Sequence, residues 1–253
     1  MSCPFFMIRY RGIDMAELLN TSDLSSKAAW QATLAEFIAV MLFVFVGSGA
    51  IIGIGMVGAD GGTTLIIAAL AHGLAITALV SAIGRISGGH INPAVTVAAV
   101  VTGRMSLVKG AMYVAAQLVG AVVGAALLLS VIPLADQGSL GAHSLNVDVA
   151  SGLIVEMLLT FMLVFVIFAT AMDPKGPGHL APFAIGLAVM VDHFVGVPLT
   201  GASMNPARSF GPALATGEWA NHWVYWIGPI MGAVLAAIIY EVIYIRGHEE
   251  EAA

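Results

Sequence analysis

Long stretches without a charged residue alternate with short polar segments along this chain. About 20 residues of helix cross the hydrocarbon core of a bilayer. Six stretches reach or approach that length, and they predict membrane-spanning helices at 37–57, 61–84, 111–135, 157–172, 176–191 and 221–240. The fourth and fifth are short as uncharged runs, but each extends across one acidic residue near its end, Glu156 or Asp192. The pattern therefore predicts an all-α membrane protein with six spans.

The composition excludes a water-soluble globule. The 253 residues are 59% hydrophobic and 9% charged, with a mean hydropathy of +0.97, which leaves too little polar surface. The first 29 residues carry charges and no apolar core region, so we expect no cleavable signal peptide. The single cysteine, Cys3, excludes an intramolecular disulfide. Because no metal-ligand cluster, nucleophile elbow or phosphate loop is present in the sequence, we expect neither an enzyme nor a cofactor, and no nucleic-acid partner.

One tripeptide occurs twice, as Asn92-Pro93-Ala94 after the second predicted span and as Asn205-Pro206-Ala207 after the fifth. A Gly-Leu-Ala triplet precedes each copy, at 73–75 and at 186–188, and the separation from triplet to tripeptide is 19 residues in both cases. Matched surroundings at two places indicate an internal duplication. The repetition points to a pore built from two equivalent halves.

The basic residues predict the orientation of the chain. Eight of the nine fall on one face of the six-span topology: Arg9, Arg11, Lys27, Arg85, Arg104, Lys109, Lys175 and Arg246. By the positive-inside rule that face, with both termini, is cytoplasmic. Arg208 alone lies in an outer connection, the one assigned to 192–222. The apolar segments 94–102 and 207–215 then enter from opposite faces. As a helix, each segment would be about 14 Å long, which is about half the hydrocarbon thickness, so the two meet near the midplane.

The residue types of the tripeptide suit a helix that begins inside a membrane. Proline is favoured at the first helical position, and Asn before it is a good N-cap through its side-chain oxygen. The amide nitrogens of Asn92 and Asn205 are then left as donors where the positive ends of both helix dipoles converge. A water molecule that accepts from both would aim its hydrogens along the pore in both directions, which interrupts proton relay. Two ordinary capped helices in a bundle are the alternative interpretation.

Three segments, 87–96, 201–212 and 222–229, carry a resemblance to the aquaporins, or major intrinsic proteins, which extends from Ala35 to Tyr244. The resemblance implies the hourglass fold, in which six transmembrane helices and two re-entrant half-helices form an inverted repeat. It also implies a pore in every protomer and a homotetramer. The narrow filter of that family corresponds by spacing to His72, His193, Ala202 and Arg208.

The filter residues resemble two subgroups of that family. His193 matches the water-selective members, whereas a histidine at position 72 is similar to the vacuolar intrinsic proteins of plants and to ammonia-permeable members. Glycerol-conducting members of that family typically carry Asp after the filter arginine and lack an aromatic pair in the sixth span. Because this chain has Ser209 there and Tyr225 and Trp226 in the sixth span, the resemblance favours water over glycerol. As in some vacuolar members, His143 of the outer connection could support the filter near Arg208; the alternative is a solvated loop histidine.

Two carboxylates, Glu36 and Glu156, occupy equivalent positions in the first and fourth spans. The resemblance implies that they accept hydrogen bonds from the backbone of the half-helix loops. Proton coupling is the other interpretation, because an ionisable residue inside a membrane is a functional candidate by default. It would make the chain a proton-coupled secondary transporter with inverted repeats.

The sequence therefore predicts a cytoplasmic tail at 1–29, a channel domain at 30–245 and an acidic cytoplasmic tail at 246–253. The repeats of the channel domain lie at about 30–135 and 149–245. We expect a passive water channel that excludes protons and ions and also admits ammonia or hydrogen peroxide. The alternatives are a facilitator of glycerol or small neutral solutes, the coupled transporter, and a membrane adhesion protein with an occluded lumen. A cell membrane is the expected location, with a vacuolar-type membrane as the alternative.

Overall fold

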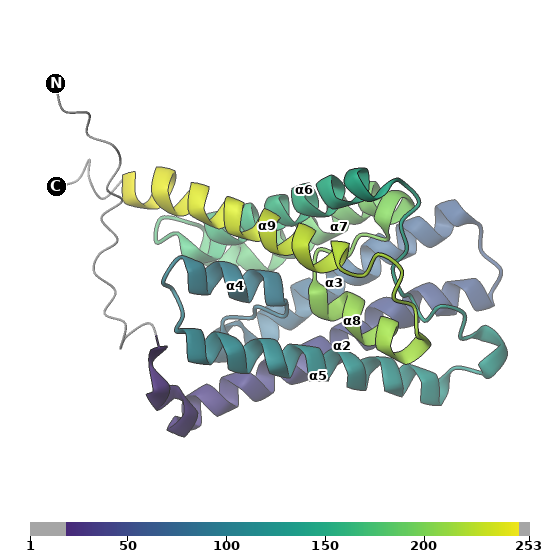
Figure 1. The fold of residues 1–253 in the computed structure, drawn as a ribbon, viewed down its shortest axis with the longest axis horizontal. Helices are drawn as coiled ribbons and strands as arrows, with labels where there is room; N and C mark the ends of the chain where they lie inside the picture. The colour runs from purple at the N-terminus through teal and green to yellow at the C-terminus, as the bar shows by residue number, and fades with distance from the viewer. Residues whose placement is uncertain (1–18, 248–253) are drawn as a thin grey trace.

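Long helices run side by side along the main axis of the computed structural model, which describes residues 19–247 (Figure 1). The helices are α2 Lys27–Met56, α3 Gly61–Ser87, α4 Pro93–Val101, α5 Leu107–Val131, α6 Val149–Ile167, α7 Ala181–Thr200, α8 Pro206–Thr216 and α9 Val224–Ile239. Shorter 3-10 turns are η1 Thr21–Ser25, η2 Leu134–Asp136 and η4 Gly178–Leu180, and π-helical turns are η3 Phe168–Met172 and η5 Tyr240–Arg246. Six helices of the described part are long and apolar enough to cross a membrane, as the sequence predicted.

Parts of the two predicted tails lie outside the described residues. Cys3 and the acidic run at 249–251 belong to these parts. Within the described part, the first long helix overlaps the last residues of the predicted tail at 1–29. Helix α2 already begins at Lys27, because the side chain of Ser26 caps it by accepting a hydrogen bond from the backbone N–H of Ala29 at 3.2 Å.

Several helices extend beyond the uncharged stretches that predicted them. Helix α7 continues to Thr200, so the assignment of 192–222 to an outer connection is wrong for its first nine residues. The reason is burial: the side chain of Asp192 is only 2% exposed inside the bundle, and the charge does not end the helix. Helix α6 likewise begins at Val149, about two turns before the buried Glu156. Counting charges underestimates a span whose acidic residue faces protein.

Glycines let the long helices approach each other closely. A Cβ atom added to Gly120 of α5 would overlap the carbonyl oxygen of Phe37 in α2, and one on Gly232 of α9 would overlap that of Met157 in α6. Helices α3 and α7 cross in the same way at Gly73. Small residues at such crossings allow backbone-to-backbone packing inside membranes. These contacts follow the duplication. Helix α2 packs on α5 as α6 packs on α9, and the third contact joins α3 to its equivalent, α7.

The two short helices lie between the long ones, α4 toward one end of the molecule and α8 toward the other (Figure 1). Each begins with the proline of an Asn-Pro-Ala tripeptide, at Pro93 and Pro206. The predicted half-helices, 94–102 and 207–215, are therefore present with boundaries shifted by one residue. The six spans and two half-helices together agree with the predicted all-α fold class.

Candidate functional site

The two tripeptides cap their helices in the same way. Asn92 has extended backbone and its Oδ1 accepts the N–H of Ala94 at 2.8 Å. Asn205 also has extended backbone, and its Oδ1 accepts the N–H groups of Ala207 at 3.0 Å and Arg208 at 3.3 Å. With proline at the first helical position, both helix N-termini are pre-organised without an orphaned N–H at that residue.

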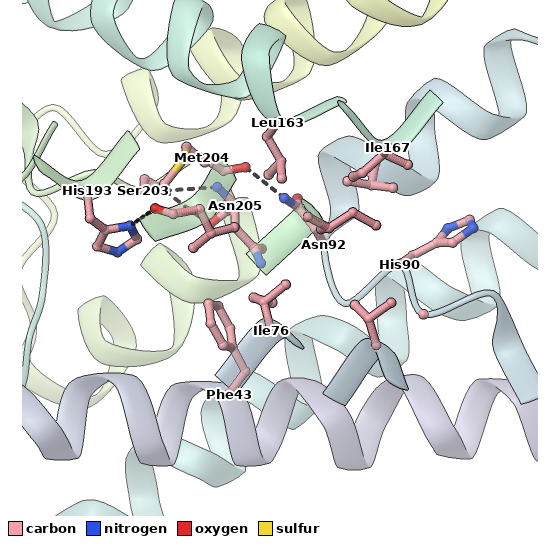
Figure 2. Close-up of a pocket in the computed structure, with 15 residues that line it drawn as sticks. Phe43, Ile76, His90, Asn92, Leu163, Ile167, His193, Ser203, Met204 and Asn205 are labelled. Carbon is pink, nitrogen blue, oxygen red and sulfur yellow. Dashed lines mark hydrogen bonds between the residues drawn. The ribbon is translucent and has the colours of Figure 1, made fainter. Parts of the chain in front are cut away.

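The first loop joins α3 to α4 and ends at Asn92, and the second loop joins α7 to α8 and ends at Asn205. The amide nitrogen of each Asn side chain donates to the loop of the other repeat. Asn92 Nδ2 donates to the carbonyl oxygen of Met204 at 2.8 Å (Figure 2). Asn205 Nδ2 donates to the carbonyl oxygen of Ile91, also at 2.8 Å. The sequence-based view left the whole NH2 group free, and the structure corrects it: one N–H of each amide joins the two loops. Because a primary amide has two N–H bonds, one remains on each side chain for a molecule in the lumen.

An uncommon backbone conformation makes these cross-links available. Ile91 and Met204, the residues directly before the two Asn, have φ of 55° and 53°. Non-glycine residues seldom adopt positive φ, and such strain persists only where the surroundings determine it. Here it directs each carbonyl to the Asn of the other repeat. The sequence did not predict this reciprocal use of two loop carbonyls.

The first loop is held by Glu36 of α2. Its carboxylate accepts hydrogen bonds from Ser87 Oγ at 2.6 Å, the N–H of His90 at 2.9 Å, the N–H of Ile91 at 2.6 Å and Gln117 Nε2 at 2.8 Å. The side chain is fully buried. Four donors within 2.9 Å satisfy the hydrogen-bonding capacity of the two carboxylate oxygens.

Glu156 of α6 does the same for the second loop. It accepts from Thr200 Oγ1 at 2.7 Å and from the N–H groups of Ser203 and Met204 at 2.9 and 2.8 Å. Like Glu36, it is fully buried. These two carboxylates fix the strained segments that precede the tripeptides.

A pair of buried tyrosines completes the support, and sequence reasoning missed its role. Tyr113 OH donates to the carbonyl of Ser87 at 2.8 Å, and Tyr225 OH donates to the carbonyl of Thr200 at 2.9 Å. The signal was present: the two tyrosines have nearly the same separation in the sequence as the two tripeptides. Tyr225 was read from the sequence only as a mark against glycerol.

A cavity surrounds the two Asn side chains. Its walls are apolar side chains of long helices, among them Phe43, Ile76 and Leu163, and it extends from His90 to His193 (Figure 2). The volume open to water centres is about 30 Å³. A water needs about 10–15 Å³ on this measure, so the cavity holds about two waters beside the remaining Asn donors.

Beyond His193 the expected filter residues form a tight cluster. The rings of His72 and His193 stack with centroids 4.4 Å apart. Each Nδ1 lies beside the carbonyl four residues earlier, His72 with Ala68 at 2.8 Å and His193 with Val189 at 2.7 Å. A carbonyl only accepts, so in the neutral imidazoles Nδ1 carries the proton and Nε2 is an acceptor.

Arg208 brings a donor with a permanent charge to the same cluster. It is 3% exposed, it lies within electrostatic range of both imidazoles, and its Nε has no hydrogen-bond partner among residues 19–247. Ala202, the remaining expected filter position, is fully buried with φ of 56°. The structure therefore brings the charged and polar filter positions together at one end of the cavity.

His143 also belongs to this cluster. Its Nδ1 lies 2.9 Å from Ser209 Oγ and 3.4 Å from Arg208 Nη1, and its ring lies 5.1 Å from that of Tyr225. The residue is 9% exposed, so the alternative of a solvated loop histidine is wrong. Burial first, and then the positive charge of Arg208, hold the pKa of His143 well below its ordinary value. We therefore assign it as a neutral imidazole at physiological pH.

Comparison with known proteins gives the family. The family model described as "Major intrinsic protein" matches residues 23–240. Aquaporin-4 of Mus musculus is 46% identical over 223 residues, 87% of this chain and 69% of that protein. Aquaporin TIP4-4 of Zea mays is 45% identical over 235 residues, which covers 90% of this chain and 92% of that protein. The probable aquaporin TIP3-2 of Arabidopsis thaliana is 47% identical over 233 residues, with coverages of 87% and 86%.

A solved structure shares the fold. The aquaglyceroporin from Plasmodium falciparum superposes with a TM-score of 0.78 over 88% of this chain and 99% of that chain, at 23% identity. At that identity the likeness concerns the architecture only. The family model and the relatives above 40% identity cover most of the chain, and they confirm the resemblance seen in the sequence. This chain belongs to the major intrinsic protein family, the aquaporins.

Proposed function

We propose that this protein is a passive water channel. The observation that carries the proposal is the meeting of Asn92 and Asn205 in one cavity, each with an N–H left for a permeant. The relatives named aquaporins support it. The protein is a multi-pass membrane protein, and in our proposal water enters through the histidine and arginine cluster, passes the two Asn in single file and leaves past His90.

Proton exclusion follows from the donors at the midpoint. A water beside the Asn pair accepts one hydrogen bond from each amide through its oxygen, so its own hydrogens point away along both halves of the lumen. It cannot accept a proton from a neighbour and pass it on in one direction. The N-termini of α4 and α8 add positive dipole ends at the same place, which disfavours hydronium and other cations.

The filter in our proposal consists of His72, His193, Ala202 and Arg208, with His143 supporting Arg208. The Nε2 atom of His193 offers an acceptor and the guanidinium of Arg208 offers donors, so a small neutral molecule with both functions fits. Water satisfies this, as do ammonia and hydrogen peroxide. The fixed charge of Arg208 repels cations. Glycerol is the less favoured alternative, because the buried Tyr225 and the ring of His143 occupy space at this end.

The structural role of Glu36 and Glu156 disfavours the coupled transporter. Their oxygens accept from loop donors at 2.6–2.9 Å, so protonation of either carboxylate would break contacts that hold the loops. A transporter that protonated and deprotonated these groups would break the hydrogen bonds that hold both loops in every transport cycle. We assign both residues to support of the half-helices.

For the assembly and its membrane we propose a homotetramer with both termini cytoplasmic, in a cell membrane or a vacuolar-type membrane. Exposed apolar side chains on the outer faces of the helices, such as Leu158 and Leu187, support contact with lipid or with other protomers. Each protomer carries its own cavity, so the proposal requires no shared pore.

Stopped-flow light scattering of proteoliposomes tests the water channel. We expect osmotic shrinkage well above that of protein-free vesicles, without a rise in proton leak. Water flux at the level of empty vesicles, from protein shown to be folded and inserted, would refute the proposal. Saturable solute uptake that follows a proton gradient would favour the transporter. Replacing His72 with Phe and comparing water flux with ammonia flux would then separate the permeants.

A further inference from the structure

The imidazole of His72 rests directly on a glycine of α2. A Cβ atom built on Gly47 would overlap His72 Nε2 and would lie 2.7 Å from Cδ2 and 3.0 Å from Cε1. Side-chain Cβ atoms do not come that close to other heavy atoms. The place that His72 occupies therefore exists only because residue 47 has no side chain.

The other sides of the ring are also occupied. Its Nδ1 lies 2.8 Å from the carbonyl oxygen of Ala68. The ring of Phe43, one turn before Gly47 on α2, meets it edge to face at 5.5 Å, and the ring of His193 stacks on it at 4.4 Å. Phe43 and Gly47 thus form a notch that receives the imidazole. A ring pushed out of this notch moves off α2 toward the space that the filter residues surround.

We infer that Gly47 is a specificity-determining residue of the channel. It lies outside the four filter positions and acts through one of them, by providing the recess that keeps His72 against α2 and so sets the open width of the filter. The inference rests on the proposed role of His72 in the filter. It makes Gly47 and His72 a matched pair, because a larger residue 47 is compatible only with a smaller residue 72.

Four variants test this pairing: Gly47→Ala, His72→Ala, the double variant, and Gly53→Ala as the control. A Cβ on Gly53, six residues further along α2, would meet nothing within 4 Å. In proteoliposomes with matched protein content, we expect Gly47→Ala to lower water permeability about tenfold, a barrier increase of about 1.4 kcal/mol. The double variant should recover the permeability of His72→Ala, and Gly53→Ala should match the wild type.

Wild-type permeability of Gly47→Ala would overturn the inference, and so would a double variant as slow as Gly47→Ala beside an active His72→Ala. If Gly47→Ala does not fold, melting temperatures provide the test: the double variant must then fold, and failure of both would contradict the contact. The melting temperatures also separate this inference from the proposed function. They report the coupling of residues 47 and 72 even if the wild-type protein conducts no water.

Discussion

At the residue scale, buried polar atoms fall into two groups. Some have hydrogen-bond partners in the protein and hold the scaffold, and others have none and mark the candidate site. The buried carboxylate of Glu156 is satisfied by three donors and belongs to the scaffold. Arg208 Nε and the Nε2 atoms of His143 and His193 are buried without a hydrogen-bond partner among the described residues. In a native fold, such unpaired groups call for an explanation. In our proposal the explanation is the permeant, which pairs with these atoms as it passes.

Replacing Glu156 with Gln tests the scaffold role. A Gln side chain keeps the shape but turns an NH2 group toward the N–H groups of Ser203 or Met204, so at least one buried donor loses its acceptor. We expect the free energy of unfolding to fall by about 2–3 kcal/mol, within the range for buried hydrogen bonds to a charged group. Thermal unfolding in detergent measures this. Unchanged stability together with altered proton-dependent transport would instead favour coupling.

The depressed pKa of His143 predicts how stability depends on pH. Burial and Arg208 keep this histidine neutral in the folded protein, whereas in the unfolded chain it binds a proton below about pH 6.5. The unfolded state then holds more protons, so stability falls as the pH drops through 6.5, by at most about 1.4 kcal/mol per pH unit. We expect the melting temperature of the wild type to fall more steeply between pH 7.5 and 5 than that of His143→Gln. Parallel curves would contradict the assignment.

At the element scale, the existence of each helix was predictable from the sequence, but its ends were not. Uncharged stretches predicted all six spans, and the Asn-Pro signal placed the starts of α4 and α8 to within a residue. The ends failed where a charged residue is buried, as at Asp192 in α7, because sequence alone does not show which face of a helix meets protein. The filter cluster was predictable only through family resemblance, since the stacking of His72 on His193 joins residues far apart in the chain.

Helix packing can be tested at a glycine crossing. Alanine at position 232 would place its methyl group against the backbone of Met157, 2.9 Å from the carbonyl carbon. Helices α6 and α9 would have to separate, and we expect a destabilisation of about 1–3 kcal/mol from overpacking. The control is Gly55→Ala on α2, where an added Cβ meets nothing within 4 Å. Thermal unfolding of both variants provides the comparison; equal melting temperatures would contradict the tight crossing.

At the scale of the whole molecule, the two repeats share the side chains that hold their half-helices but differ in other side chains around them. The pairs of Asn, Glu and Tyr side chains hold the two half-helices alike, and the regular spacing of the repeats revealed the Asn and Glu pairs in the sequence, though not the role of the Tyr pair. The differences were readable only in part: the sequence set Arg208 apart, but it did not reveal the role of Gln117. Gln117 adds a fourth donor to Glu36, with no counterpart at Glu156. Arg208 and His193 belong to the second repeat, but the imidazole that stacks on His193 is that of His72 from α3 of the first repeat, and His143 comes from the segment between the repeats. In our proposal both repeats therefore contribute to one selective end of the lumen, beyond a symmetric midpoint.

This arrangement predicts two barriers to cations in series, which Arg208→Val separates. Burying a charge without full pairing costs stability, so the valine variant should be as stable as the wild type or more stable. Water flux should persist, because the Asn pair and the cavity beside it remain. Proton leak, followed with a pH-sensitive dye in the same proteoliposomes, should rise, yet stay well below that of an ion channel, since the helix dipoles at the midpoint still repel hydronium. An unchanged proton leak would assign all proton exclusion to the Asn pair. A proton leak as large as that of an ion channel would assign all of it to the filter.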